Sequence, residues 1–161
     1  SMREMGMGVV IEYADQQGRP QWSKPPSNTW DYTVFAANAA TPEPDSRFNL
    51  VFEKIPGGHG GFNRWTINGK SWPDAEPLTV KAGRRYRFVM ENKSGDDHPI
   101  HLHRHTFEVT RIAGKTTSGI RKDTVNIPRR QSAEIDFVAD DPGLTLFHCH
   151  MQLHMDFGLW R

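Results

Sequence analysis

The clearest structural signal lies in residues 85–90, which read Arg85-Tyr86-Arg87-Phe88-Val89-Met90. The even-numbered side chains are large and apolar, whereas the odd-numbered ones include two arginines. Because successive side chains of a β-strand point to opposite faces, this alternation predicts a strand with one face on an apolar core. Residues 132–138 alternate in the same way, with Ile135 and Phe137 on the apolar parity.

Short strands separated by turn residues are expected along most of the chain. The segments with strand character are residues 47–55, 64–68, 85–92, 106–113, 132–138 and 144–148. Asn68-Gly69 is a hairpin signal, and Asp141-Pro142-Gly143 is a turn signal. No segment of useful length has the 3.6-residue period of a helix. The predicted fold class is therefore all-β, a sandwich or a barrel.

The length of 161 residues, with 36% hydrophobic and 24% charged residues, suits one packed domain preceded by an arm. We expect this domain to span residues 45–161. Residues 14–44 contain five prolines and predict a Pro-rich linker or arm, anchored by Trp22 and Trp30. Residues 1–13 contain a short apolar strand, which is either the terminal strand of a preceding domain or an added edge strand.

Charge and hydropathy argue against two classes of partner. The 20 basic and 19 acidic residues nearly cancel, so we expect no nucleic-acid surface, which would need clustered positive charge. The chain has no run of about 18 apolar residues, so we expect no membrane span. The single cysteine, Cys149, cannot form an internal disulfide and does not reveal the compartment.

Two short stretches hold six of the eight histidines and the only cysteine. They are His98-Pro99-Ile100-His101-Leu102-His103 and His148-Cys149-His150, the latter followed by His154. A thiolate among several imidazoles is a ligand set that suits copper, and a His₂Cys set with a weak axial neighbour is the blue-copper arrangement.

Strand parity divides these residues into two ligand sets. His148 and His150 should face one side of a strand and Cys149 the other, so that one strand serves two metal sites. His101 and His103 share a face, and we expect Pro99 to break the ladder and free His98 to point elsewhere. The first predicted set is His98, Cys149 and His154, and the second is His101, His103, His148 and His150. A bound metal would hold Cys149 as the thiolate.

The pattern H-P-x-H-x-H, followed downstream by H-C-H-x-x-x-H-x-x-x-G-L, resembles the C-terminal cupredoxin domain of multicopper oxidases, the laccase-like enzymes. The likeness extends from about Phe62 to Leu159 and includes residues 64–69 and 123–128. It implies a Greek-key β-sandwich or barrel of the cupredoxin type. At Arg104 the chain departs from the glycine that is usual in this family, which we interpret as a subfamily mark.

The resemblance also implies a role for each ligand. His98, Cys149 and His154 would hold a type 1 copper that takes electrons from the reducing substrate. His101 would bind a type 2 copper, and the type 3 ligands would be His103, His148 and His150. Leu159 occupies the axial position, and because leucine cannot coordinate, we expect a three-coordinate site of relatively high potential. Leu159 can also be an ordinary core residue of the last strand, and the two interpretations are compatible.

A trinuclear centre in this family needs ligands from two cupredoxin domains, and this chain supplies one half. We therefore expect a fragment of a longer enzyme, because no second H-x-H pair occurs before Asp97 and residues 4–10 resemble the end of a preceding cupredoxin domain. The alternative is that residues 6–13 fill a sheet edge, in the same body or in a neighbouring copy.

The implied activity is that of a laccase-like oxidoreductase. Its parent would oxidise phenols, aromatic amines or metal ions one electron at a time and reduce O₂ to water, with a second cupredoxin domain in cis or trans, in some relatives within a homo-oligomer. Its location would be periplasmic or secreted. The alternatives are a single-copper electron-transfer module without oxidase activity and a zinc site built from the same residues.

Several neighbouring residues have structural interpretations beside functional ones. His105 is expected in the core or behind the ligands. His59 is expected at the surface, and its alternative place is at the rim of the site near the substrate. Met151 and Met155 are expected to pack around the metal rather than bind it. Asp96 and Asp97 either orient ligands or form a solvated turn.

Overall fold

The computed structural model describes residues 11, 13–15, 18, 32–37, 39–57 and 61–161. The chain divides into two compact units, residues 1–30 and 31–161. Most of the strand predicted at residues 6–13 lies outside the described residues, as do Trp22, Trp30 and His59.

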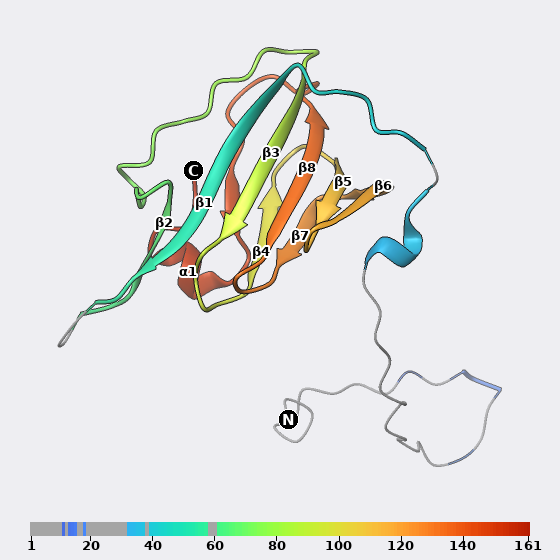
Figure 1. Cartoon of the computed structure of the whole chain (residues 1–161). Helices are drawn as coiled ribbons and strands as arrows, with labels where there is room; N and C mark the ends of the chain where they lie inside the picture. The colour runs from blue at the N-terminus through green and yellow to red at the C-terminus, as the bar shows by residue number, and fades with distance from the viewer. Residues whose placement is uncertain (1–10, 12, 16–17, 19–31, 38, 58–60) are drawn as a thin grey trace. The chain divides into compact units, whose positions relative to one another are not determined.

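Two β-sheets form the body of the second unit (Figure 1). The strands are β1 (Ser46–Ile55), β2 (Arg64–Ile67), β3 (Arg85–Asn92), β4 (His98–Leu102), β5 (Phe107–Ile112), β6 (Lys115–Lys122), β7 (Thr124–Ile127), β8 (Ser132–Val138) and β9 (Phe147–Cys149). The larger sheet has the order β2-β1-β3-β8-β5-β6, and the smaller has the order β7-β4-β9. Strands β1 and β3 run parallel, and the other paired neighbours run antiparallel. The predicted all-β class is confirmed.

The strands predicted from alternation are present, and the differences concern less regular segments. The sequence did not predict β6 or β7; β6 is an edge strand interrupted by Gly119, and β7 is only four residues long. The strand predicted from residue 144 begins at Phe147. A 3₁₀ turn, η1 (Tyr32–Phe35), and a short helix, α1 (Gln152–Asp156), complete the unit. Neither is long enough to produce a detectable helical period.

The expected ladder break at Pro99 was wrong. Pro99 lies within β4 opposite Asn126 of β7, and its carbonyl accepts a hydrogen bond from the His150 N–H at 2.7 Å. His98 and His101 face opposite sides of β4 for a simpler reason, because residues three apart in a strand have opposite parity.

The apolar core lies between the two sheets. Strands β1, β3 and β8 contribute one wall and β4, β7 and β9 the other. Phe88 of β3 and Phe147 of β9 meet edge to face, with ring centroids 5.2 Å apart, and Phe52 of β1 packs 6.4 Å from the same ring. Because Phe147 is two residues before Cys149, this packing holds the backbone on which the cysteine lies.

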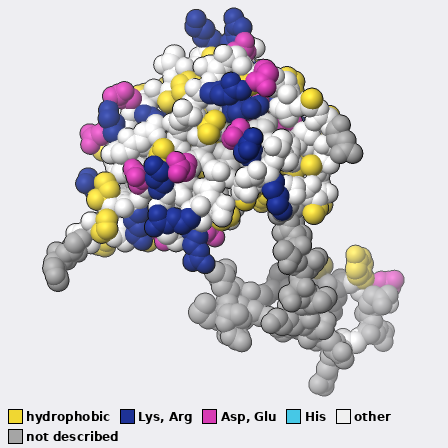
Figure 2. All heavy atoms as spheres, viewed as in Figure 1, with side chains coloured by type: hydrophobic (Ala, Val, Ile, Leu, Met, Phe, Trp, Pro, Cys, Tyr) yellow, Lys and Arg dark blue, Asp and Glu magenta, His cyan; other side chains and the backbone are white. Residues whose placement is uncertain are grey.

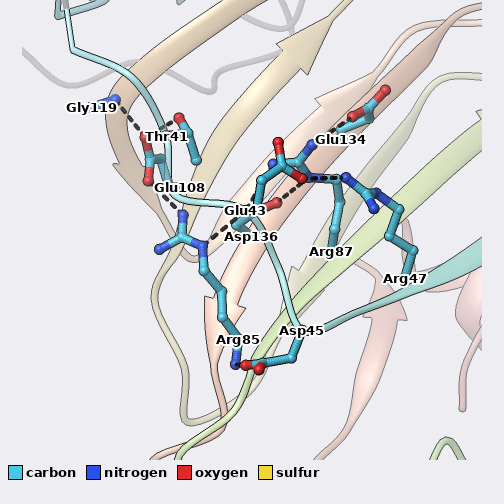
Figure 3. A network of polar contacts seen from close by, with 10 residues as sticks. All are labelled: Thr41, Glu43, Asp45, Arg47, Arg85, Arg87, Glu108, Gly119, Glu134 and Asp136. Atoms are coloured by element: carbon cyan, nitrogen blue, oxygen red, sulfur yellow. Dashed lines mark hydrogen bonds and ion pairs between the residues drawn. The ribbon is translucent and has the colours of Figure 1, made fainter.

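An ion network covers the outer face of the larger sheet (Figure 3). Asp136 of β8 has a fully buried side chain, although its parity places it on the outer face. It accepts hydrogen bonds from Arg85 Nε at 2.9 Å and from Arg87 Nε at 2.6 Å. Glu108 accepts from Arg85 Nη2 and from the Thr41 hydroxyl, so the segment before β1 packs over these charges.

The charges on the surface are mixed in sign. On the face shown in Figure 2, basic and acidic side chains are interspersed over the described part of the chain. Within the described residues no helix is long and apolar enough to cross a membrane.

Candidate metal centre

The pairing of β4 with β9 places the two histidine stretches side by side. Ile100 lies opposite Cys149, and His101 lies opposite His148. Directly opposed residues of neighbouring strands share a face of the sheet. Cys149 therefore points into the core, and His148 lies with His101 on the other face, as the parity of the sequence predicted.

Three donor atoms converge on the core side of this sheet. His98 Nδ1 and His154 Nδ1 are 3.1 Å apart, and Cys149 Sγ lies 3.6 Å from the first and 3.7 Å from the second. One point in their plane is about 2 Å from each atom, which is close to the bond lengths of a first-row metal ion to imidazole and thiolate. His98 and Cys149 are fully buried and His154 is 5% exposed. The donor set and its spacing fit a type 1 copper site.

The turn after β9 brings His154 back to Cys149. The His154 N–H donates to the Met151 carbonyl at 2.9 Å, which starts the helical turn of α1. The chain then reverses, and Leu159 pairs with both ligands through its backbone: its N–H donates to the His154 carbonyl, and its carbonyl accepts from the Cys149 N–H. Leu159 is fully buried, and its axial role stays a prediction.

A buried series of hydrogen bonds orients His98. His98 Nε2 lies 2.8 Å from Ser94 Oγ, which is 2.8 Å from Asn92 Oδ1. Asn92 in turn donates to the carbonyls of Asp96 and Ile127. With Ser94 donating to Asn92, Ser94 Oγ accepts the Nε2–H of His98, which leaves Nδ1 with its lone pair toward Cys149. No motif predicted these hydrogen bonds; the signal for them in the sequence is a polar residue, Asn92, on the buried parity of β3.

Burial sets the protonation of the metal-free site. It lowers the pKa of His98 to about 4, with the neighbouring His154 adding to the effect. It raises the pKa of the Cys149 thiol to about 11. The metal-free site is therefore neutral near pH 7, and a metal ion must displace the thiol proton to bind sulfur.

Four further imidazoles gather on the opposite side of β4 and β9. His103 Nε2 and His148 Nε2 are 2.9 Å apart, and the His101 ring centroid lies 4.7 Å from that of His103 and 4.9 Å from that of His150. The Nδ1–H of His101 donates to the Asp123 carbonyl, and that of His148 donates to the Cys149 carbonyl. These bonds leave Nε2 of both rings without a proton, which is the form that can bind a metal ion, and in the metal-free protein His148 Nε2 can accept a hydrogen bond from His103 Nε2.

The exposure of these four rings differs from that of the first set. His150 is exposed and His101 and His103 are half-buried, whereas His148 is buried. Burial lowers the pKa of His148, and for His103 burial and the charges of His101 and His150 do the same. Neutral imidazoles are the form that binds a metal ion.

A cavity of about 540 Å³ lies beside His154. Asp96, Asp97, Asn126 and Met151 are among its lining residues, and Asn126 Oδ1 is buried without a hydrogen-bond partner. Met151 is 47% exposed, so the expected packing role for this methionine was wrong.

Two other residues near the ligands are explained by their surroundings. Arg104 has a φ of 64°, in the left-handed region that glycine adopts without strain, and its guanidinium pairs with Asp141. This pairing holds a non-glycine residue in the unusual conformation. His105 is buried and its Nδ1–H donates to the His103 carbonyl at 3.1 Å, which agrees with its expected place behind the ligands.

Comparisons with known proteins agree with this description. A family model described as multicopper oxidase matches residues 45–161. The chain is 37% identical over 123 residues to the multicopper oxidase MmcO of Mycobacterium tuberculosis, covering 76% of this chain and 23% of that protein. It is 35% identical over 104 residues to a copper resistance protein A homolog of Pseudomonas syringae pv. tomato, covering 65% of this chain and 17% of that protein.

The fold is also similar to that of a solved structure. The blue copper oxidase from Nitrosomonas europaea superposes with a TM-score of 0.62 at 25% identity, over 71% of this chain and 42% of that one. The chain thus spans less than a quarter of the length of the two sequence relatives and less than half of this structure.

Proposed function

Because the chain belongs to the multicopper oxidase family, we propose that it is the copper-binding cupredoxin domain through which a laccase-like enzyme receives electrons. The observation that carries this proposal is the buried triangle of His98 Nδ1, Cys149 Sγ and His154 Nδ1, with four more imidazoles on the reverse side of the same strands. Copper bound in the triangle would supply reversible one-electron transfer.

The residues of this chain supply the geometry for that transfer. Ser94 holds His98 with Nδ1 toward the sulfur, and the backbone pairing of Leu159 with Cys149 and His154 keeps both ligands in place. Cys149 is bonded directly to His148 and His150, so the shortest covalent route between the two imidazole sets passes along one peptide segment. The proposed electron path follows this segment.

We propose that the second set is half of a trinuclear oxygen-reducing centre. His101, His103, His148 and His150 approach one another, and their most exposed member, His150, leaves the group open on one side. A second cupredoxin domain, in cis or from a neighbouring copy, would add the remaining ligands. Dioxygen would be reduced to water only in that assembled site.

Electrons would enter beside His154. The cavity there contains the carboxylates of Asp96 and Asp97 and the unpartnered Asn126 Oδ1, all of which accept hydrogen bonds or bind cations. Phenols, aromatic amines and reduced metal ions can each meet such acceptors. These three classes are therefore the proposed reducing substrates.

Copper loading tests the proposal. The purified chain, stripped with a chelator and reloaded, should bind one copper tightly and show the intense visible band of a copper–thiolate site. Cys149→Ser should lose this band and keep its fold, because the packing change is small. His105→Asn, which alters a histidine outside both sets, should keep the band; colour that survives in Cys149→Ser would contradict the assignment.

A second candidate function is a single-copper electron-transfer module. The observation that favours it is that the complete triangle comes from this chain alone. The measurement that separates the two functions is oxygen consumption with a phenol as donor. The isolated chain should not turn over, whereas the chain joined to its second domain should do so if it is an oxidase. Steady turnover by the isolated monomer would contradict the half-site proposal.

We also propose a periplasmic or secreted location, as the resemblance implies. Fractionation of the source cells with an antibody against residues 45–161 would test this, and a purely cytoplasmic signal would contradict it.

A further inference from the structure

Trp65 packs directly against one of the proposed copper ligands. Its indole ring stacks on the imidazole of His154, with ring centroids 4.3 Å apart and planes inclined by 28°. Trp65 is 3% exposed and belongs to β2, some 90 residues before the ligand in sequence. Nothing in the ligand motifs includes this residue.

The indole is itself held in one orientation. Trp65 Nε1–H donates to Asp96 Oδ2 at 3.2 Å, and the same oxygen pairs with Lys54 Nζ at 3.0 Å. Lys54 lies opposite Trp65 in the β1–β2 ladder, and its ammonium is 5.3 Å from the indole centroid. The ring therefore cannot turn without breaking a charge-assisted hydrogen bond.

The backbone around Trp65 is tied to the segment that carries His154. The Trp65 N–H donates to the carbonyl of Phe157 at 3.0 Å, and the Ser71 hydroxyl donates to the Trp65 carbonyl at 2.9 Å. Phe157 follows α1, which contains His154. Strand β2 and α1 lie side by side in Figure 1. Hydrogen bonds therefore tie the backbone of Trp65 to the segment that follows His154, which holds the two stacked rings together.

His154 has few other restraints on its ring. Its Nδ1 faces His98 and Cys149, and α1 is a single short turn whose backbone alone does not fix a side-chain torsion. Imidazole ligands of metals are normally oriented by a partner outside the coordination sphere. Ser94 has that role for His98, and the face of Trp65 is the corresponding support for His154.

We infer that Trp65, locked by Asp96 and Lys54, is a positioning residue that sets the orientation of the His154 imidazole toward copper. This inference rests on the proposed function. It makes the geometry of the copper site depend on an ion pair at the protein surface, because Lys54 and Asp96 are each about one-third exposed. Trp65 acts through His154 and does not touch the metal.

The test is a mutant cycle read out by spectroscopy. Trp65→Phe keeps an aromatic face but removes the N–H, and Asp96→Ala removes the acceptor. Each should change the hyperfine splitting of bound Cu(II) in electron paramagnetic resonance and lower copper affinity by about tenfold. The double variant should show little more than the single Trp65→Phe change, since both remove the same bond. Additive effects, or unchanged spectra, would overturn the inference.

Two matched variants separate positioning from general packing. Trp72→Phe alters another stacked tryptophan, 48% exposed and paired with Trp160, and should leave the spectrum unchanged. Asp96→Asn keeps an acceptor oxygen and should change the spectrum less than Asp96→Ala. If Trp72→Phe changes the spectrum as much as Trp65→Phe, the effect is not specific and the inference fails.

A measurement without copper distinguishes this inference from the proposed function. In the metal-free protein, the His154 ring protons should show a ring-current shift that Trp65→Leu abolishes and Trp65→Phe reduces. A wild-type chain that binds no copper would refute the proposed function while the shift still supports the stack. A blue wild-type chain without the shift would refute only the inference.

Discussion

At the scale of single residues, the proposed copper site depends on hydrogen bonds that hold its ligands from behind. His98 is fully buried, so each of its ring nitrogens needs a partner in the metal-free protein. Ser94 Oγ is the hydrogen-bond partner of His98 Nε2, and Asn92 orients Ser94 by a second hydrogen bond. A ligand set alone therefore does not define the site, since the orientation of each ring comes from its neighbours.

Ser94→Ala should destabilise the metal-free protein and weaken copper binding. It leaves His98 Nε2 buried without a partner, which costs about 1–3 kcal/mol of unfolding free energy, and it should lower copper affinity by about tenfold. Urea unfolding and competition with a chelator measure the two effects. Ser94→Thr keeps the hydroxyl and should restore most of both; equal losses in the two variants would argue against the hydrogen bond as the cause.

Leu159→Met should lower the reduction potential of the bound copper. Leu159 is buried and pairs through its backbone with Cys149 and His154. If the axial assignment is right, a thioether at this position would coordinate the copper. Axial ligands tune the potential of blue-copper sites. Redox titration of the visible band measures the change, and a potential that stays the same or rises would show that the axial assignment is misplaced.

At the scale of elements, the larger sheet carries a buried charge on its outer face. Asp136 of β8 lies between Arg87 of β3 and Glu108 of β5 in the register of the sheet. Two neighbouring carboxylates would repel one another, and Arg85 lies where it bonds to both. Each buried carboxylate in this network is therefore paired with an arginine, and the polar segment before β1 packs over the pairs (Figure 3).

Asp136→Asn should cost about 3 kcal/mol of unfolding free energy, because it removes one partner of a buried ion pair and leaves two arginines without their shared anion. Chemical denaturation of the metal-free protein measures this loss. Glu43→Gln breaks the exposed pair with Arg47 and should cost less than about 1 kcal/mol. Similar losses in the two variants would contradict the role given to burial.

At the scale of the whole molecule, the histidines of the two ligand sets make the free energy of unfolding depend on pH and on metal binding. Burial lowers the pKa values of His98, His148 and His154, so the unfolded chain binds more protons than the folded one in the range where these groups titrate. Copper favours the same neutral imidazoles. Metal binding and neutral pH therefore stabilise the same state.

The metal-free protein should lose stability as the pH falls from about 6.5 toward 4. The contribution of neutral His98 is complete above 6.5, its ordinary pKa, and is lost down to its folded value of about 4, a change of about 3 kcal/mol. Carboxylates with lowered pKa values add to the loss only near the acid end of this range. Urea midpoints at several pH values measure it. His98→Gln should flatten the dependence, and an unchanged slope would contradict the assignment.

Local alternation was enough to predict much of this molecule. Strands β3 and β8 follow from residues 85–90 and 132–138, and the opposite orientations of Cys149 and His148 follow from strand parity. Parity is a local property of an extended backbone, so one sequence reveals it. The histidine motifs likewise indicated which residues could share a metal ion, and the distances in the structure agree for His98, Cys149 and His154.

Other features were decided only by tertiary structure. Trp65 meets His154, and Asp136 is buried at a polar position, because segments far apart in sequence pack together. Asn92, which orients Ser94, likewise donates to the carbonyl of Ile127 on another strand. The residue pattern of one segment does not tell which residues of a distant segment will lie against it. Short elements such as β7 and α1 have too few residues to show a repeating pattern. Local patterns in the sequence therefore predicted the fold class, which the structure confirms, and a ligand set, which stays a prediction. Packing between distant segments supplies partners that no local pattern reveals, such as Trp65 against His154 and Ile127 against Asn92.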